Sequence, residues 1–192
     1  LQSNKFTLTD SIFCENGSYK LANNRMLNDH EEHGFLSVEE ILIHSSNIGI
    51  SKISNSFNKK SLYKFLKKFG LGSKTYLPLN NESGGKIRSI SEWSRTSKNY
   101  ISIGQEIALT NLQLAIAYCS IANGGYMIKP KIIKKIVKNG DISYINKTTE
   151  IRKVLDKEIA NNILKTLKLV VSDGTAKSIN LIGYNIAGKT GT

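Results

Sequence analysis

The chain has 192 residues, 40% of them hydrophobic, with two prolines and 15 glycines, a composition that favours one globular domain with its own core and argues against disorder. No run approaches the roughly 18 apolar residues of a membrane span, and residues 1–20 lack the cationic start and apolar core of a signal peptide. We therefore expect any membrane anchor to lie outside this chain. Cys14 and Cys119 form no metal cluster, and the sequence leaves open whether they pair.

The formal net charge is +12, from 27 Lys and Arg against 15 Asp and Glu. Such a balance raises the question of a polyanionic partner, either nucleic acid or acidic lipid. The basic residues are scattered, however, without zinc-finger spacing or an aromatic-rich RNA-binding signature. The pattern therefore argues against nucleic-acid binding and favours a solvated, lysine-rich surface.

Residues 1–35 mix short apolar runs with Gly, Asn and charge, and we predict an irregular segment there. Ser37 and Glu40 then form a capping box, which predicts the start of a helix. This helix runs directly into Ser45-Ser46-Asn47, and a second helix is expected to resume after Gly49.

Apolar side chains next recur at the spacing of one helix face, at Leu62, Phe65, Leu66 and Phe69. This pattern predicts a core-facing helix that stops at Gly70. Residues 71–103 lack periodicity and are interpreted as a long surface excursion. Thr110 and Gln113 form a second capping box, which opens an apolar and therefore buried helix that ends at Gly124-Gly125.

The residues that follow predict a hairpin and a last helix. Ile132–Val137 and Ile142–Ile145 flank Asn139-Gly140-Asp141, and Asn-Gly readily adopts the positive φ of a tight β-turn. Asp156 is expected to cap a helix that ends near Gly174.

A strand through Ile182, Tyr184 and Ile186 is predicted to lead into Lys189-Thr190-Gly191. Without internal repeats, these elements make one α+β domain in which helices pack on an antiparallel sheet.

Two short motifs suggest chemistry when taken together. In a Lys-Thr-Gly-Thr segment on a strand, Lys189 supplies positive charge and the hydroxyls of Thr190 and Thr192 can bond a carboxylate, while Gly191 leaves room for backbone pairing. Alone, such a segment is weak evidence, and Ser45-x-Asn47 is weaker still, because Ser and Asn gather at helix ends for capping. Their combination, in this order along one chain, is more specific.

The sequence segments around both motifs match a known family. They are Leu36-Ser-Val-Glu-Glu-Ile-Leu-Ile-His-Ser-Ser-Asn-Ile-Gly, Ser102-Ile-Gly-Gln, Thr110-Asn-Leu-Gln-Leu-Ala, Ile121-Ala-Asn-Gly-Gly, Gly174-Thr-Ala and Ala187-Gly-Lys-Thr-Gly-Thr. The pattern spans nearly the whole chain and resembles class B penicillin-binding proteins, the monofunctional transpeptidases of cell-wall synthesis. The resemblance implies the fold shared by these transpeptidases and serine β-lactamases.

The resemblance also implies a role for each motif residue. Ser45 would relay a proton between the active-site lysines and the departing amine, and Asn47 would hold the nucleophile's lysine and the substrate's amide. Lys189 would reach Ser45 and lend positive charge. Substrate binding would fall to Thr190-Gly191-Thr192, with the two hydroxyls on the carboxylate and the N–H of Thr192 as half of the oxyanion hole. No metal or organic cofactor is implied.

The implied reaction is a two-step acyl transfer, in which a serine attacks a stem peptide ending in D-Ala-D-Ala and a second stem's amine resolves the acyl-enzyme. The nucleophile's Ser-x-x-Lys motif precedes Ser45 in the family. The three local matches, which begin at Ser56, Ser61 and Ser83, all follow it and are interpreted as chance. We therefore expect residues 1–192 to be a partial transpeptidase domain, inactive alone, with the nucleophile upstream and the end of the domain missing.

Other functions remain open at this stage. A β-lactamase or β-lactam sensor shares the acylation machinery, and Glu82 or Glu92 is its candidate deacylating base. A non-catalytic scaffold of a wall-synthesis complex is a second alternative. The three histidines, at His30, His33 and His44, lack ligand spacing and are interpreted as solvated surface rather than a metal site.

The resemblance further implies partners and a location. The expected ligands are peptidoglycan stem peptides and β-lactam antibiotics, and the expected protein partners are a glycosyltransferase and the divisome, since the pattern leans toward the cell-division type. The parent would be anchored in the bacterial inner membrane with its catalytic domain on the periplasmic side. No nucleic-acid partner is expected.

Overall fold

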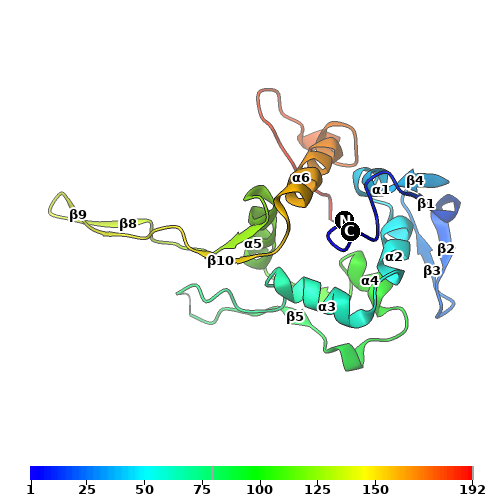
Figure 1. Ribbon diagram of the computed structural model, residues 1–192, viewed down its shortest axis with the longest axis horizontal. Coiled ribbons are helices and arrows are strands. Elements are labelled where there is room, and N and C mark those ends of the chain that lie inside the picture. Colours follow the sequence, from blue (N-terminus) through cyan, green and yellow to red (C-terminus); the bar gives the residue numbers. More distant parts are fainter. Residues whose placement is uncertain (79, 192) are drawn as a thin grey trace.

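The structure, a computed structural model, describes residues 1–78 and 80–191 (Figure 1). Its helices are α1 Val38–Ile43, α2 Asn47–Asn55, α3 Lys59–Lys68, α4 Ser97–Ser102, α5 Asn111–Ala122 and α6 Lys157–Ser172. Its strands are β1 Ser11–Phe13, β2 Ser18–Lys20, β3 Met26–Asn28, β4 Phe35–Ser37, β5 Lys86–Ile87, β6 Ile107–Ala108, β7 Tyr126–Ile128, β8 Lys135–Lys138, β9 Asp141–Ile145 and β10 Glu150–Lys153. Three short 3₁₀ turns, Glu15–Gly17, Ile90–Glu92 and Lys177–Ile179, complete the elements of the described residues.

The predicted α+β class is confirmed, and all strand pairing in the described residues is antiparallel. The strands form five separate pairs, however, rather than one sheet: β1 with β4, β2 with β3, β5 with β6, β7 with β10 and β8 with β9. Helices and hairpins therefore surround several small apolar clusters instead of packing on one broad sheet.

The N-terminal segment contradicts the prediction of irregular structure over residues 1–35. It contains β1 to β3 and the first residue of β4, and each of these strands is only three residues long. Strands this short show too little alternation to stand out in a sequence. They nevertheless enclose a cluster with two helices, made of Cys14, Leu21, Leu27, Leu36, Ile41 and Ile48.

Both predicted capping boxes are confirmed. Ser37 and Glu40 exchange side-chain and backbone bonds at the start of α1, and Thr110 and Gln113 do so at the start of α5. Asp156 is the N-cap residue of α6, as expected, but its carboxylate bonds to side chains outside the helix instead of the first-turn amides.

Two helices are less buried than their apolar residues predict. No residue of α3 is fully buried, and its apolar face borders a cavity instead of filling a core. In α5, Leu114 and Tyr118 are exposed, because the helix packs on β7 and α6 through its other side. Amphipathic spacing sets which face of a helix is apolar but not whether something covers that face. The excursion over residues 71–103 also contains α4, which no periodicity had indicated.

Helices α1, α2 and α6 meet closely. A Cβ added at Gly49 of α2 would lie 2.5 Å from Cγ1 of Ile41 in α1, so the two helices touch backbone to side chain. Between α1 and α6, the buried hydroxyl of Thr166 donates to the Glu39 carboxylate at 3.0 Å. Helix α1 is therefore held on one side by α2 and on another by α6.

The predicted hairpin is confirmed as β8 and β9, joined by Asn139 and Gly140, whose φ angles are 51° and 86°. In Figure 1 this hairpin, here called the hairpin arm, extends well away from the helices. Every residue of β8 and β9 is exposed, including apolar side chains on both faces.

The strand predicted through Ile182, Tyr184 and Ile186 is not formed within the described residues. Ile182 is fully exposed and Tyr184 is 72% exposed, and the printed backbone bond of Tyr184 is a local turn to Leu181. A strand requires a neighbouring backbone to pair with, and alternation alone does not supply one.

In the part of the chain that the structure describes, no helix is long and apolar enough to cross a membrane. The question of the two cysteines is settled: both are free, with Cys14 buried and Cys119 exposed.

Candidate functional site

Ser45 lies in the turn between α1 and α2 and has a backbone φ of 59°. The N–H of Ser46 donates to the carbonyl of Ile41 at 3.0 Å, which gives α1 a Schellman-type end with Ser45 at the left-handed position. Glycine is usual at this position, because a Cβ disfavours positive φ. A serine held there stores backbone strain, which concentrates at functional sites.

Asp29 fixes the start of α2. Its carboxylate accepts bonds from Oγ of Ser46 at 2.5 Å and from the N–H of Ile48 at 2.9 Å. Oγ of Ser46 also accepts from the N–H of Gly49 and so caps the helix. A negative charge at a helix N-terminus is favourable, because the first-turn N–H groups lack partners within the helix. The strained turn at Ser45 is thus anchored on its α2 side.

Lys189 contacts this turn from the far end of the chain. Its Nζ donates to Oγ of Ser45 at 2.5 Å, although 144 residues separate the two, and to Oγ1 of Thr190 at 3.1 Å. The N–H of Gly188 donates to the carbonyl of Leu167 in α6 at 3.1 Å, which fixes the backbone just before Lys189. One ammonium group therefore joins the hydroxyls of both motifs.

The end of α6 supports Thr190. Oγ1 of Thr190 lies 2.9 Å from Oγ1 of Thr175, and the N–H of Thr175 donates to the carbonyl of Ile43 at 3.3 Å. The chain approaches α1 this closely because Gly174 has no side chain: a Cβ there would lie 2.3 Å from the carbonyl oxygen of Ile43. We call the α1–α2 turn, residues 174–175 and residues 188–190 together the motif junction.

A cleft of about 270 Å³ opens at the motif junction. Its lining residues are Ile41, Leu42, Ser45, Ser46, Asn47, Ile50, Ser102, Ile103, Lys189 and Thr190. Polar groups that can donate or accept hydrogen bonds lie beside the apolar side chains of α1 and α2. This mixture suits a ligand that has both a charged group and an apolar body.

Burial lowers the pKa of Lys189 from its ordinary value, because desolvation disfavours the charged ammonium form. The group therefore releases its proton more readily than a solvated lysine does, and in its ammonium form it offers positive charge to an anion. Lysines shifted in this way are common among groups that take part in proton transfer.

The structure brings most of the predicted site residues together. Lys189 contacts both Ser45 and Thr190, and Asn47 lines the same cleft. The Nδ2 of Asn47 donates to the carbonyl of Asn28 at 3.1 Å. Gly191 is exposed and belongs to no helix or strand, and Thr192 lies outside the described residues.

The prediction that the second helix resumes after Gly49 is wrong: α2 begins at Asn47 with Ser46 as its N-cap residue, so residues 44–46 connect the two helices and Asn47 lies in the first turn of α2.

Three residues of the site were not anticipated. They are Asp29 and Thr175, which hold the motif junction, and Ser102, which lines its cleft. Asp29 lies 16 residues before Ser45 in sequence, Thr175 lies 14 residues before Lys189, and Ser102 is farther from both. For Asp29 no local signal existed. Ser102 and Thr175 belong to the segments Ser102-Ile-Gly-Gln and Gly174-Thr-Ala, which match the family pattern, and this match was the sequence signal that could have identified them.

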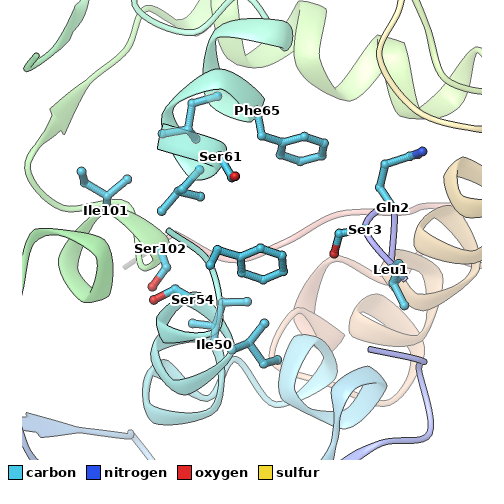
Figure 2. A pocket seen from close by; sticks show the side chains of 13 residues that line it. Leu1, Gln2, Ser3, Ile50, Ser54, Ser61, Phe65, Ile101 and Ser102 are labelled. Carbon is cyan, nitrogen blue, oxygen red and sulfur yellow. The ribbon is translucent and has the colours of Figure 1, made fainter. Parts of the chain in front are cut away.

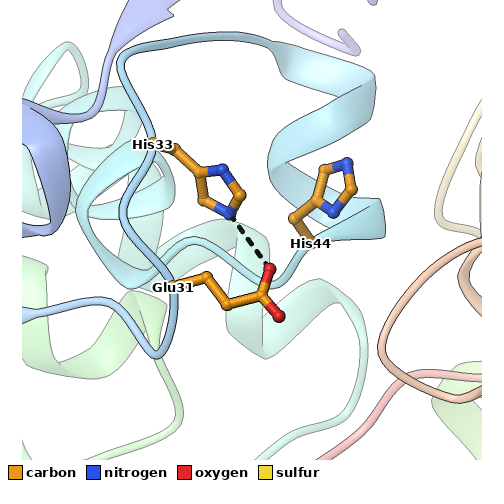
Figure 3. Close-up of side chains that lie close together, drawn as sticks. All are labelled: Glu31, His33 and His44. Atoms are coloured by element: carbon orange, nitrogen blue, oxygen red, sulfur yellow. Dashed lines mark ion pairs between the residues drawn. The ribbon is translucent and has the colours of Figure 1, made fainter.

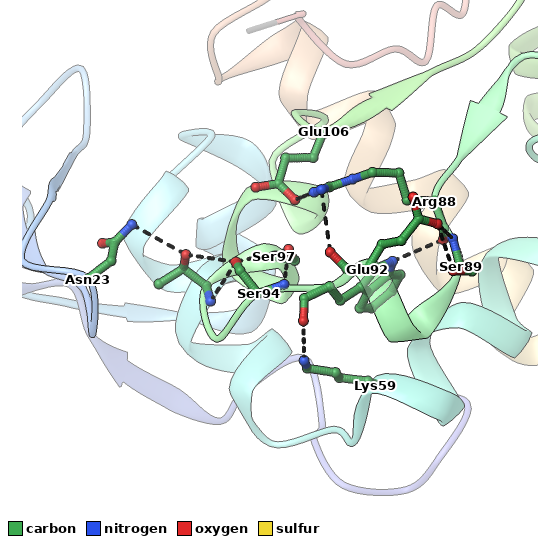
Figure 4. Close-up of polar contacts among 10 residues, drawn as sticks. Asn23, Lys59, Arg88, Ser89, Glu92, Ser94, Ser97 and Glu106 are labelled. Carbon is green, nitrogen blue, oxygen red and sulfur yellow. Dashed lines mark hydrogen bonds and ion pairs between the residues drawn. The ribbon is translucent and has the colours of Figure 1, made fainter.

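A polar network holds the segment that leads to Ser102 (Figure 4). Arg88 pairs with Glu106 across this segment, and Asn23 of the N-terminal region donates to Oγ1 of Thr96 at 3.3 Å. Lys59 at the start of α3 donates to the carbonyl of Trp93 at 2.6 Å. These contacts tie the long excursion to three other parts of the chain and so position the wall of the cleft.

The rival candidates for chemistry lie elsewhere. None of Ser56, Ser61 and Ser83 lines the cleft. Glu82 accepts bonds from Thr75 and Tyr76, and Glu92 caps its own turn at Ser89, so these carboxylates already serve local structure. Hydrogen bonds of this kind lower the pKa of both glutamates, which weakens them as bases.

A Ser-x-Asn turn and a Lys-Thr-Gly segment that face one cleft of an α+β domain define the class of penicillin-binding proteins and serine β-lactamases. Comparison with known proteins narrows this class. The chain belongs to the family described as the penicillin binding protein transpeptidase domain, which it matches over residues 1–192, and its relatives are class B penicillin-binding proteins.

Penicillin-binding protein PbpB of Mycolicibacterium smegmatis is 35% identical over 156 residues, which cover 77% of this chain and 24% of that protein. Peptidoglycan D,D-transpeptidase FtsI of Buchnera aphidicola subsp. Baizongia pistaciae is 35% identical over 179 residues, covering 92% and 30%. The crystal structure of penicillin-binding protein 3 from Mycobacterium tuberculosis, complexed with aztreonam, has a TM-score of 0.86 at 28% identity, covering 99% and 44%. The chain thus spans about a quarter to a third of the curated relatives it matches.

Proposed function

We propose that this chain is the part of a peptidoglycan D,D-transpeptidase that carries the second and third active-site motifs, and that it acts in septal wall synthesis. The observation that carries the proposal is the 2.5 Å bond from Nζ of Lys189 to Oγ of Ser45 in a cleft. Membership of the transpeptidase family and the names of the relatives support it.

In the proposed reaction, a serine in a part of the protein outside residues 1–192 attacks the penultimate peptide bond of a stem peptide. Ser45 relays to the departing D-Ala amine the proton that the attacking serine loses, and Lys189 orients the Ser45 hydroxyl. The substrate carboxylate binds at Lys189 and Thr190, where positive charge and a hydroxyl lie together. An incoming amine from a second stem then takes the acyl group and frees the serine.

We further propose that the segment with the nucleophile occupies the apolar cavity beside the cleft (Figure 2). This cavity of about 450 Å³ is lined mainly by apolar side chains of α2, α3 and α4, and it shares Ile50 and Ser102 with the cleft. An apolar helix seated there would cover Phe65 and place its polar end toward Ser45. The incomplete burial of α3 supports this assignment.

The finer assignments rest on the relatives. We propose that the parent is anchored in the bacterial inner membrane, with this domain on the periplasmic side, and that its partners are a glycosyltransferase and the divisome. We also propose that the ligands are stem peptides and β-lactams. The crystal structure of the related penicillin-binding protein 3, complexed with aztreonam, supports this proposal. The net charge of +12 suits an anionic wall polymer or membrane surface.

The deciding experiment is covalent labelling of the full-length protein with a fluorescent penicillin, followed by mass spectrometry of the labelled peptide. We expect the label on a serine outside residues 1–192, and a much slower reaction in a Ser45→Ala variant. A matched control is Ser56→Ala, because Ser56 begins a Ser-x-x-Lys match but does not line the cleft.

Three outcomes would count against the proposal. Label on Ser56, Ser61 or Ser83 would overturn the assignment of the motifs. Absence of label on a folded protein would favour the non-catalytic scaffold. Rapid loss of label through hydrolysis would favour a β-lactamase.

A further inference from the structure

A second group of side chains lies next to the motif junction and takes no part in it. Glu31 and His33 belong to the loop between β3 and β4, and His44 is the C-cap residue of α1 (Figure 3). One ligand atom from each of the three lies within 4.8 Å of the other two. Residues separated in sequence by a whole strand and helix therefore converge at one point.

His33 has an unusual environment for a surface histidine. Its side chain is only 17% exposed, and its Nε2 is buried without a hydrogen-bond partner among the described residues. The carboxylate of Glu31 is 3.9 Å away, too far for a hydrogen bond, and the ring of His44 is 5.1 Å away between centroids. Buried polar atoms rarely lack a partner, because each loses its hydration without compensation. Only His30 fits the expected picture of a solvated histidine.

We propose that Glu31, His33 and His44 bind a divalent transition-metal ion, with Zn²⁺ as the first candidate. Two imidazoles and one carboxylate are a ligand set that zinc prefers, whereas Mg²⁺ and Ca²⁺ take oxygen ligands. Two ligand atoms bound to one zinc ion at about 2.1 Å each lie at most about 4.2 Å apart. The spacing of His33 and Glu31 already satisfies this limit, and Glu31, 70% exposed, is free to rotate inward.

The ion would connect two segments that hold Ser45. His44 directly precedes Ser45, whose backbone is strained, and the loop of Glu31 and His33 follows Asp29, which anchors α2. Coordination would therefore clamp this loop to the end of α1 and reduce the motion of the turn. The metal takes a structural role in this proposal, and the transpeptidase proposal does not depend on it.

The test uses the full-length protein and the three histidines as matched variants. Zn²⁺ affinity is measured by competition with a chromophoric chelator, and the melting temperature is recorded with and without one equivalent of Zn²⁺. We expect His33→Gln and His44→Gln each to weaken binding by about tenfold or more and to abolish the Zn²⁺-dependent rise in melting temperature. His30→Gln, which changes an exposed histidine outside the cluster, should bind as the wild type does.

A measurement on the wild type guards against variants that fail to fold. Co²⁺ replaces zinc in such sites and gives visible absorption that reports ligand type and geometry. We expect one equivalent to produce bands of a nitrogen- and oxygen-ligated ion, which added Zn²⁺ removes. The proposal is overturned if the wild type binds neither ion at micromolar concentrations, or if His30→Gln weakens binding as much as the other two variants do.

Discussion

The motif junction and the hairpin arm are built in opposite ways. At the junction, Lys189 bonds to Ser45 across 144 residues, and Thr175 bonds to the carbonyl of Ile43. In the arm, β8 and β9 pair with each other and with no other strand of the described residues, in a register that sets Ile136 opposite Tyr144. Both of these side chains are exposed, whereas the junction lies against buried parts of α1 and α6.

This difference separates local from long-range determinants of structure. An Asn-Gly turn between two apolar runs specifies a hairpin by itself, so the arm forms from contacts between near neighbours. The junction exists only when α1, α6 and the last residues are all in place. A change in the junction should therefore affect activity and global stability, and a change in the arm should affect neither.

The largest contrast is expected when one lysine is removed from each region. Lys189→Ala in the full-length protein should slow acylation by a fluorescent penicillin by about 10²–10⁴-fold, because it removes both the charge in the cleft and the partner of Ser45. Lys138→Ala, in the exposed β8 strand, is the control and should acylate at the wild-type rate. Stopped-flow fluorescence measures both. Equal rates in the two variants would remove Lys189 from the proposed chemistry.

The pH dependence of acylation tests the charge on Lys189. Burial lowers its pKa, so its ammonium form is complete at low pH and is lost, as the pH rises, earlier than in a solvated lysine. If the charged form binds the carboxylate, the second-order acylation rate should fall on the alkaline side, about tenfold per pH unit beyond that pKa. Lys189→Arg keeps its charge and should move the fall to higher pH. If the rate of the Lys189→Arg variant falls at the same pH as the wild-type rate, the titrating group is not Lys189.

Close backbone contact at the junction predicts a sensitive glycine. In Gly174→Ala, the new Cβ would lie 2.3 Å from the carbonyl oxygen of Ile43, and relief requires α6 and α1 to separate. We expect a loss of about 1–3 kcal/mol in the free energy of unfolding, together with slower acylation. Gly34→Ala is the control, since its Cβ would meet only Oδ1 of Asn16 at 3.7 Å. Urea denaturation of both variants decides: equal stabilities would mean that the helices are not held as close as described.

A smaller effect is expected at Asp29. Asp29→Asn keeps an oxygen for the N–H of Ile48 but loses the negative charge at the start of α2 and one acceptor facing Ser46. The expected cost is about 1 kcal/mol of unfolding free energy. Asp141→Asn, in the exposed β9 strand of the arm, should cost less than that. Chemical denaturation curves for the pair test this, and an equally small change in both would show that Asp29 does not anchor α2.

The two regions also explain which sequence predictions held. The capping boxes of α1 and α5 and the Asn139-Gly140 turn were found because each is determined within a few residues. The prediction of a strand through Ile182 was wrong, because alternation of apolar and polar residues cannot show that a partner strand is present. The prediction that α5 is buried was wrong for a related reason. The apolar residues of a helix show that it has an apolar face, but they do not show whether another element covers that face.

The sequence predicted the motif residues of the site but not the residues that support them, again because only local patterns can be recognised in a sequence. Ser45, Lys189 and Thr190 were found through short motifs whose context matched a family. Asp29 and Thr175 support them through contacts that only the fold creates, and single Asp or Thr residues carry no distinguishing signal in a sequence. The left-handed conformation at Ser45 was equally hidden, because a serine gives no hint of positive φ.

The smallest effect is expected in the hairpin arm, where apolar residues contribute little to global stability. The double variant Ile136→Ser with Tyr144→Ser removes a cross-strand pair of exposed side chains, and we expect less than about 0.5 kcal/mol change in the free energy of unfolding. Ile48→Ala, at a fully buried site, should cost about 2–5 kcal/mol. A loss above about 1 kcal/mol in the arm variant of the full-length protein would mean that the arm packs against chain outside residues 1–192, since exposed pairs do not contribute that much. The contrast between the two regions would then belong to this part of the protein and not to the whole.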